Sequence, residues 1–258
     1  MPIYLTIGDI SIDCRNPAAL RDFYAELFGG ECRTMYGCPA MIAENGLTIL
    51  FMQCDFDYIP PVWPEIPGAQ QKQMHLDFTV DDLLSAVEKA IRLGAAKPAE
   101  QYGGADFVTL ADPEGHPFYL IQRSNSKSEF DLYYEHKGYG AIPNVSINID
   151  CPDTKKLREF YAELTGWDKN FHRSALVAEN GTVVHFAQCD FDYIPPVWPE
   201  IPGAQQKQMH LNFQAEDLPS AVAEAIRLGA AKPAEQYGGA DFVTLTDPAG
   251  HPLCLCRK

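Results

Sequence analysis

The chain has 258 residues, of which 46% are apolar, and a formal net charge of −15 at pH 7. This charge repels phosphate backbones and anionic lipid, so neither nucleic acid nor a membrane surface is an expected partner. No apolar run reaches the roughly 18 residues of a membrane-spanning helix, and the N-terminal segment has neither a basic region nor a small-residue cleavage site, so we expect a cytoplasmic protein.

The first predicted elements are a strand, a helix and three further strands. Residues 9–13 alternate polar and apolar side chains, as a half-buried strand does. Asn16 is a predicted N-cap with Pro17 at the first helical position, and apolar residues then recur at helical spacing as far as Gly29. Three strands are predicted after this helix, near residues 32–35, 39–43 and 47–53.

The same order of elements then begins again. Residues 75–80 alternate polar and apolar side chains, and Asp82 caps a predicted helix that ends at Gly94. Three strands are predicted after it, near residues 97–101, 106–111 and 116–122. This half of the chain therefore contains two β-α-β-β-β modules, in an α+β fold whose helices cover one face of curved mixed sheets.

The second half of the chain repeats the first. The segment 53–78 returns as 188–213 with a single change, Asp77 to Asn212, and the match continues to the end of the chain at a constant offset of 135 residues. Solenoid units recur every 20 to roughly 50 residues, so a period this long indicates a duplicated domain. We predict two domains and a linker, at residues 1–123, 141–258 and 124–140. Four modules then form an internal pseudo-dimer, either as a monomer or as a homodimer.

Polar side chains are predicted to gather on the sheet face that points away from the helices. Strand alternation places Asp9 and Asp13 there, together with His75 and Asp77. A concave face with convergent polar groups is a common ligand site. The predicted ligand-binding residues of the sheets are Asp9, Asp13, Asp77, Tyr119 and Asn212.

The segments 55–71 and 190–206, here called the straps, are long loops rich in apolar residues and proline. The prolines leave little backbone entropy to lose, so we predict that each strap packs rigidly between the two modules of its half. Two interpretations stay open: the strap covers an otherwise open sheet, or it offers aromatic rings to a planar ligand. The rings concerned are those of Tyr58, Trp63, Tyr193 and Trp198.

His75 and His210 occupy the same position in the two halves and are the predicted catalytic residues. Imidazole titrates near neutral pH, where a general base works best. Asp77 lies two residues after His75 on the same face and is placed to orient it, whereas Asn212 carries no charge. The alternative, an imidazole that is hydrogen-bonded within the sheet, stays open for both histidines.

Three motifs of the first half carry a resemblance to a known family. They are DxSIDCxNPxxLRDFYxELFGG, HLDFTVDDLLSAVEKAIRLGA and DPEGHPFYL. Their spacing resembles the vicinal oxygen chelate superfamily, which includes glyoxalase I, extradiol dioxygenases and bleomycin resistance proteins. The resemblance covers the chain apart from the linker and implies two tandem glyoxalase-like domains.

The resemblance also implies where a divalent metal, such as Zn, Fe, Ni or Mn, would be held. The four matching positions are Asp9, Leu50, His75 and Tyr119 in the first half, and Ser146, His185, His210 and Cys254 in the second. The first set lacks the hard ligands of an octahedral site, so no metal is expected there. The competent ligands of the second set, which form a possible open zinc site, are His185, His210 and Cys254.

The packing of the modules decides between two arrangements of these residues. Cavities form either within each half or, as in some relatives, from modules of different halves. The facing groups in the second case would be His185 with His75 and Tyr119, and Cys254 with Asp9 and His210.

The favoured prediction is a protein that binds a small molecule in two like cavities without a cofactor, as the bleomycin resistance type does. Acidic and aromatic side chains suit a cationic or planar aromatic ligand. The alternatives are a metal-dependent lyase, isomerase or dioxygenase, and a pseudo-dimeric scaffold with degenerate sites.

Overall fold

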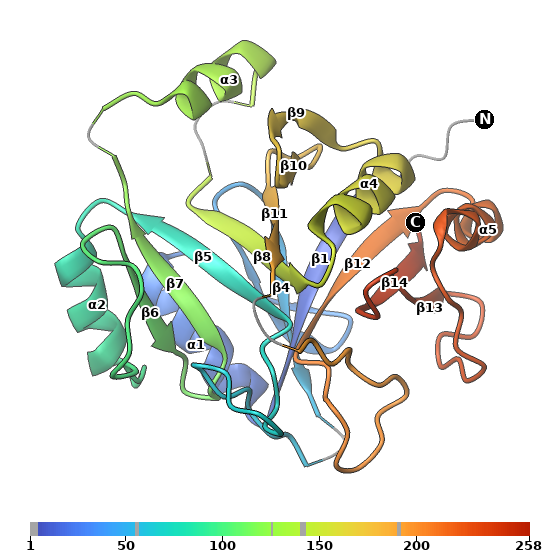
Figure 1. Cartoon of the computed structure of the whole chain (residues 1–258), viewed down its shortest axis with the longest axis horizontal. Coiled ribbons are helices and arrows are strands. Elements are labelled where there is room, and N and C mark those ends of the chain that lie inside the picture. Colours follow the sequence, from blue (N-terminus) through green and yellow to red (C-terminus); the bar gives the residue numbers. More distant parts are fainter. Residues whose placement is uncertain (1–4, 55–56, 125, 140–142, 190–191) are drawn as a thin grey trace.

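The structure, a computed structural model, describes residues 5–54, 57–124, 126–139, 143–189 and 192–258. Four modules follow one another, and the helix α3 lies between the second and the third (Figure 1). The elements of the first half are β1 (Leu5–Cys14), α1 (Pro17–Phe28), β2 (Glu31–Met35), β3 (Cys38–Ile42), β4 (Thr48–Gln53), β5 (Met74–Val80), α2 (Leu83–Arg92), β6 (Phe107–Ala111) and β7 (Pro117–Gln122). The remaining elements are α3 (Glu129–Lys137), β8 (Val145–Cys151), α4 (Thr154–Thr165), β9 (Asp168–His172), β10 (Ala175–Val177), β11 (Val183–Gln188), β12 (Met209–Ala215), α5 (Leu218–Leu228), β13 (Phe242–Thr246) and β14 (Pro252–Arg257).

The helices begin where the capping residues predict. The side chain of Asn16 accepts a hydrogen bond from the backbone N–H of Ala19 at the start of α1. Asp82 accepts one from Ser85 at the start of α2. Each bond satisfies an N–H group that has no partner within the helix, which confirms both predicted starts.

The strand predicted at 97–101 is not formed. Ala96 makes only an isolated bridge to Ala111 at this place, and Pro98, which has no N–H to donate, follows two residues later. The side chain of Gln101 takes over the pairing, because it accepts from the N–H of Thr109 at 2.9 Å and donates to its carbonyl oxygen at 3.0 Å. The second half repeats both features, so the second and fourth modules have one strand fewer than predicted.

Modules of different halves join to form the sheets. Sheet A has the order β13-β14-β12-β1-β4-β3-β2, and sheet B has the order β6-β7-β5-β8-β11-β10-β9. The antiparallel pairs β1 with β12 and β5 with β8 are the seams at which the halves meet. Of the two arrangements left open by the sequence, the structure has the one that combines modules of different halves.

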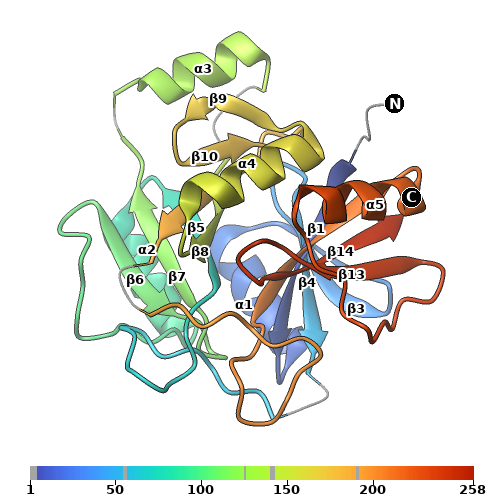
Figure 2. The same ribbon diagram turned by 45° about the vertical axis from the view of Figure 1, so that its right-hand side comes forward.

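The core lies between the apolar faces of the two sheets. The ring of Tyr24 on α1 lies 5.9 Å from Phe51 of sheet A and 5.8 Å from Phe78 of sheet B. Tyr161 on α4 likewise contacts Phe186 of sheet B and Phe213 of sheet A. These aromatic contacts join each helix to strands of its own half. Each sheet, in contrast, combines strands of both halves, as Figure 2 shows from a second side.

The linker contains the helix α3, which the sequence did not predict. Ser128 and Asp131 form a capping box at its start. Tyr134 of α3 is fully buried, packs against Val177 and Val183 of sheet B, and donates a 2.6 Å hydrogen bond to the carbonyl oxygen of Gly181. Helix α3 thus covers one end of sheet B, on the side away from the common core.

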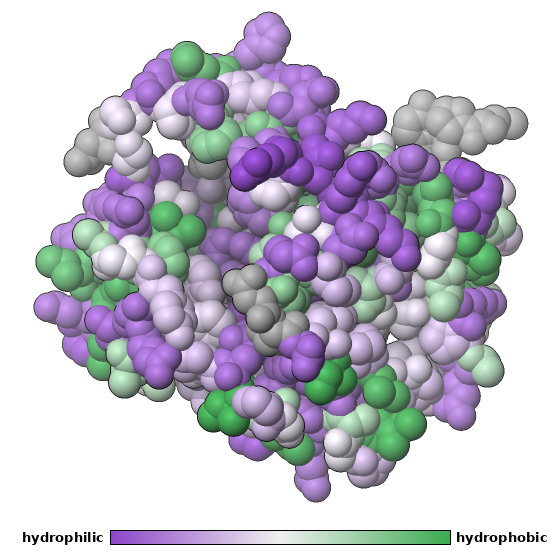
Figure 3. Space-filling model, in the orientation of Figure 1, coloured by the Kyte–Doolittle hydropathy of each residue, from purple (hydrophilic) through white to green (hydrophobic). Residues whose placement is uncertain are grey.

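The surface is mainly polar. Figure 3 shows hydrophilic side chains over most of one side of the molecule, with groups of apolar side chains at its left and right edges and along its lower edge, where the straps lie. The exposed isoleucines of the straps are Ile59, Ile66, Ile194 and Ile201. Among the described residues, no helix has the length and apolar character needed to cross a bilayer.

Candidate functional site

Two polar faces lie on the sheets, on the side away from the core. Face A belongs to sheet A and face B to sheet B, and each takes side chains from both halves. The polar residues of face A are Asp9, Ser11, Asp13, Lys207, His210, Asn212 and Cys254. Those of face B are Lys72, His75, Asp77, Tyr119, Asn148, Asp150 and His185.

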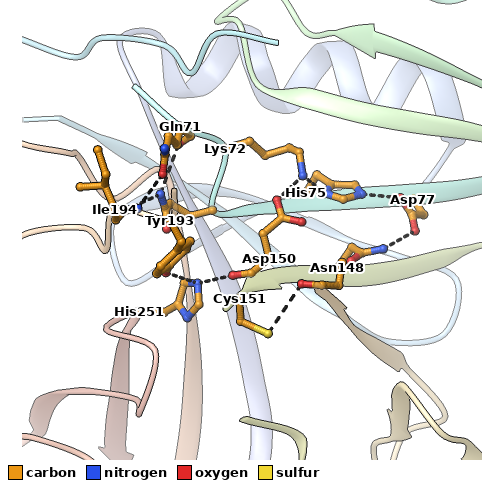
Figure 4. Close-up of polar contacts among 12 residues, drawn as sticks. Gln71, Lys72, His75, Asp77, Asn148, Asp150, Cys151, Tyr193, Ile194 and His251 are labelled. Carbon is orange, nitrogen blue, oxygen red and sulfur yellow. Dashed lines mark hydrogen bonds and ion pairs between the residues drawn. The ribbon is translucent and has the colours of Figure 1, made fainter. Parts of the chain in front are cut away.

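A chain of polar contacts crosses face B (Figure 4). The ammonium of Lys72 contacts the carboxylate of Asp150 and lies 3.2 Å from Nδ1 of His75. Nε2 of His75 lies 3.2 Å from Oδ1 of Asp77. Oδ2 of Asp77 accepts a hydrogen bond of 3.3 Å from Asn148. The charged members of this chain are buried, so water screens their interactions little.

The contacts of His75 determine its tautomer. A lysine ammonium has only donors, so Nδ1 accepts from Lys72 and the ring proton lies on Nε2, toward Asp77. Burial favours the neutral form of Asp77, but the contact with His75 and the hydrogen bond from Asn148 outweigh it and hold the pKa of Asp77 below its usual range. Asp77 is therefore a buried carboxylate held by His75 and Asn148, with no lysine or arginine paired to it among the described residues.

Face A has an ion pair equivalent to that of face B. Its second carboxylate lies on β1, whereas that of face B lies on β5, the equivalent of β12. Lys207 pairs with Asp13; burial lowers the pKa of Lys207, but this carboxylate, together with that of Glu200, outweighs burial and raises it. Asn212 donates hydrogen bonds to Oδ1 of Asp9 and, at 2.9 Å, to Oγ of Ser11. Burial raises the pKa of Asp9 to about 6 although both neighbours oppose this change. At neutral pH Asp9 is thus a second buried carboxylate with neutral partners.

The two histidines predicted as catalytic have different surroundings. Burial and the ammonium of Lys207 lower the pKa of His210 well below its usual range. Nδ1 of His210 has no hydrogen-bond partner in the part of the chain that the structure describes. The equivalent Nδ1 of His75 accepts from Lys72, and Asp77 lies on the other side of its ring. The sequence signal for these different surroundings was the residue two positions after each histidine, which is Asp77 after His75 and Asn212 after His210.

The residues predicted as a zinc set do not meet. His185 lies on β11 in sheet B, whereas His210 and Cys254 lie on β12 and β14 in sheet A. Across the described ranges, no three His, Cys, Asp or Glu side chains are grouped as a metal ion requires. These donors, as they are placed, do not fit a divalent metal, and a protein without a cofactor stays a prediction.

The strap tryptophans lie over the lysines of the faces. The ammonium of Lys72 lies 5.4 Å from the ring centroid of Trp63, and that of Lys207 lies 5.4 Å from Trp198. Trp63 is also 6.3 Å from the ring of Tyr119. Both indole N–H groups are buried and lack a hydrogen-bond acceptor within the described residues. The straps therefore cover the sheets and also bring aromatic rings to the faces.

Tyr58 and Tyr193, the other strap residues predicted to bind a ligand, are bonded to turns. The hydroxyl of Tyr193 lies 2.8 Å from Nε2 of His251, which is also 2.9 Å from the carbonyl oxygen of Asp150. Burial opposes a charge on His251, but the carboxylate of Asp247 raises its pKa above the usual value. Tyr58 has the same kind of contact, 2.7 Å from His116. These tyrosines anchor the straps to the DPxGH turns.

Reciprocal glutamine contacts join the two straps, and the sequence did not predict them. The side chain of Gln71 accepts from the N–H of Ile194 and donates to the carbonyl oxygen of Asp192, both at 2.8 Å. Gln206 makes the equivalent contacts to the first strap, also at 2.8 Å. The repeated AQQKQ segment thus binds its own copy, and its near identity in the two halves was the available signal.

Two hollows in the structure lie away from the polar faces. The larger, of about 950 Å³, is at the end of α4 beside Trp167 and Glu179, and a smaller one of about 490 Å³ is at the equivalent end of α1. The carboxylate of Glu179 already accepts from the indole of Trp167 and the backbone N–H of Ile7. Asp77 and Asp9, the buried carboxylates that no lysine or arginine pairs with among the described residues, are on the faces, so we place the candidate sites there.

Comparisons with known proteins agree with this fold. A model of the glyoxalase-like domain matches residues 9–121 and 146–256. The structure is similar to glyoxalase I from Zea mays, with a TM-score of 0.61, 14% identity, and coverage of 99% of this chain and 93% of that one. It is also similar to the cppA protein from Streptococcus pneumoniae, with a TM-score of 0.52, 13% identity, and coverage of 98% and 100%. No curated protein matches the chain. The family match extends over most of both halves, and the chain therefore belongs to the glyoxalase-like family of the vicinal oxygen chelate superfamily, with two tandem domains.

Proposed function

We propose that each polar face binds a small molecule that carries a positive charge. One observation carries the proposal: each face keeps a buried carboxylate, Asp77 or Asp9, that is paired with no lysine or arginine in the described part of the chain. The lysine of each face does not neutralise this carboxylate, because it is already paired with Asp150 or Asp13. Among the lysine and the two aspartates of each face, one negative charge is thus in excess.

A bound cation would supply the missing charge. An ionised carboxylate that is taken out of water costs several kcal/mol unless an opposite charge or hydrogen bonds compensate it. Neutral donors supply part of this compensation at Asp77 and Asp9. The strap tryptophans add aromatic surface beside the carboxylates, which favours an organic cation over a hydrated ion.

The histidines support the carboxylates in this proposal. Nδ1 of His75 is engaged by Lys72, and its Nε2 lies 3.2 Å from the carboxylate of Asp77, so in this proposal the ring supports Asp77 rather than taking a proton from a ligand. The proposal uses no metal, because the donors of the described residues do not converge in threes.

A thermal-shift series tests the proposal. Benzyltrimethylammonium is compared with benzoate and with benzyl alcohol, which keep the ring and change the charge. A ligand that binds the folded protein raises the Tm in proportion to the logarithm of its concentration. We expect the cation alone to do so, and we expect the effect to disappear in the double variant Asp9→Asn/Asp77→Asn. Glu26→Gln/Glu88→Gln, which removes two exposed carboxylates on α1 and α2, is the matched control for net charge.

Two results would contradict the proposal. One is an equal shift with benzoate, and the other is a cation effect that survives in the double variant. The same series is run after dialysis against a chelator and again with Zn²⁺, Ni²⁺ or Mn²⁺. Stabilisation that requires the metal would favour the metal-dependent lyase, isomerase or dioxygenase instead.

A further inference from the structure

The two faces carry different residues on the strand next to Asp77 and next to its equivalent, Asn212. On sheet B, Asp77 of β5 is in register with Tyr119 of β7. On sheet A, the equivalent Asn212 of β12 is in register with Cys254 of β14. Paired residues of neighbouring strands project on the same side of a sheet, so Tyr119 and Cys254 stand at the same place on their faces.

Aromatic rings gather around Tyr119, the strand neighbour of Asp77 on face B. The ring of Tyr119 is stacked on Phe107 at 5.2 Å and lies 4.4 Å from the ring of His75. Trp63 closes the group at 6.3 Å from Tyr119. Oδ1 of Asp77, at 3.2 Å from Nε2 of His75, makes no hydrogen bond with good geometry in the described part of the chain. An anionic oxygen beside several ring faces is the arrangement that binds a methylated ammonium, which has little or no hydrogen-bonding capacity.

Small hydrogen-bonding groups occupy the same place on face A. Cys254 takes the position of the tyrosine, and its Sγ lies 3.5 Å from Oγ1 of Thr244. The carboxylate of Asp9 and the hydroxyl of Ser11 lie within hydrogen-bond reach of Asn212. Oxygen acceptors that lie close together suit a primary ammonium, whose three N–H donors all require partners when water is removed.

We infer that the two faces select different cations: face B a quaternary or otherwise methylated ammonium, and face A a primary ammonium. Tyr119 and Cys254 are the specificity-determining residues. This division rests on the proposed function, because it presupposes that both faces bind cations. It adds the chemical class of each ligand.

Calorimetric titration with two matched probes tests the division. Benzyltrimethylammonium and benzylammonium share the ring and the charge, and the nitrogen carries three methyl groups in the first and three N–H donors in the second. Asp9→Asn disables face A and isolates face B, whereas Asp77→Asn isolates face A. We expect the quaternary cation to bind at least ~10-fold more tightly than the primary one to the Asp9→Asn protein, and the order to reverse in the Asp77→Asn protein.

Exchange of the specificity residue sharpens the test. Adding Tyr119→Cys to the Asp9→Asn protein replaces the tyrosine of face B by the residue of face A. This change should lower the affinity for the quaternary cation by about 10-fold and leave that for benzylammonium within about 3-fold. Circular dichroism and the Tm establish that each variant is folded. Because the replacement is smaller than the tyrosine, it requires no new space in the sheet.

The outcomes separate this inference from the proposed function. If both isolated faces bind the two probes with the same preference, or if Tyr119→Cys weakens both equally, the division is overturned and cation binding stands. If neither probe binds the wild-type protein, the proposed function and the division fail together. If the two isolated faces prefer opposite probes, and Tyr119→Cys removes the preference of face B for the quaternary cation, the results support both the proposed function and the division.

Discussion

Asn212 donates a hydrogen bond to the carboxylate of Asp9 across the seam between β12 and β1. Asn212 is also the single position at which the segment 188–213 differs from 53–78, where Asp77 stands. The residue that faces Asp77 across the other seam is Ser146. Each of these facing pairs therefore holds one carboxylate, supplied in both cases by the first half of the chain, and the change from Asp77 to Asn212 keeps a second carboxylate away from Asp9.

The first prediction concerns this pair. Asn212→Asp places two buried carboxylates opposite each other, and we expect it to lower the free energy of unfolding by about 1 to 3 kcal/mol at pH 7.5. The repulsion raises the pKa of the pair in the folded state, so the loss should shrink as the pH falls and the pair takes up a proton. Urea unfolding at several pH values measures it. The double variant Asp9→Ser/Asn212→Asp copies the residues of the other seam and should recover most of the loss; no recovery would contradict the explanation.

The second prediction is a pH dependence due to Asp9. Its pKa is raised from 3.8 to about 6 in the folded protein. Between these pH values the folded state holds a proton that the unfolded state has released, so stability is lost as the pH rises through about 6. Asp9→Asn does not titrate. We expect it to be more stable than the wild type by about 2 kcal/mol at pH 7.5 and equal to it near pH 4. Thermal unfolding across this range measures the difference; a constant gap would show that Asp9 is not the titrating group.

The elements of the fold were predictable because their signals are local. The N-cap Asn16, the alternation in 9–13 and the helical spacing on α1 each concern residues a few positions apart. The strand expected at 97–101 was wrong because alternation does not show that Gln101 bonds to the neighbouring strand through its side chain. The linker helix α3 was missed because only Tyr134 on it is buried, so it has no apolar stripe.

The candidate site was predictable only in part, because each face is made from distant parts of the chain. His75, Asp77 and Asp9 were placed on polar faces by alternation alone. The partner of Lys72 is Asp150, 78 positions away, and nothing near either residue indicates the other. The sequence allowed the modules to pair within or between halves, and this choice decides which side chains share a face.

The third prediction concerns the buried ion pair of face B. Lys72→Met leaves the carboxylate of Asp150 buried without its cation, and we expect a loss of about 3 to 5 kcal/mol of stability. Replacing both residues, as Lys72→Met/Asp150→Leu, removes the unpaired charge and should cost less than the single change. Urea unfolding of the two variants measures the difference. A double variant at least as unstable as the single one would show that the charges are not what the pair contributes.

The fourth prediction concerns one half of the chain expressed alone. A fragment of residues 1–124 exposes the strand edges that pair with β12 and β8 in the whole chain, and such edges recruit new partners. Because β5 is nearly identical to β12, we expect β1 of one copy to pair with β5 of another and form a dimer with two composite sheets. That pairing places Asp9 opposite Asp77, two carboxylates, where the whole chain has Asp9 opposite Asn212. Asp77→Asn should therefore tighten the fragment dimer by about 10-fold or more, since each of its two seams gains a compatible pair. Sedimentation equilibrium measures both dimers, with Glu88→Gln as the charge-matched control. A folded fragment that stays monomeric, or an Asp77→Asn dimer no tighter than the control, would show that the seam does not govern the assembly of the halves.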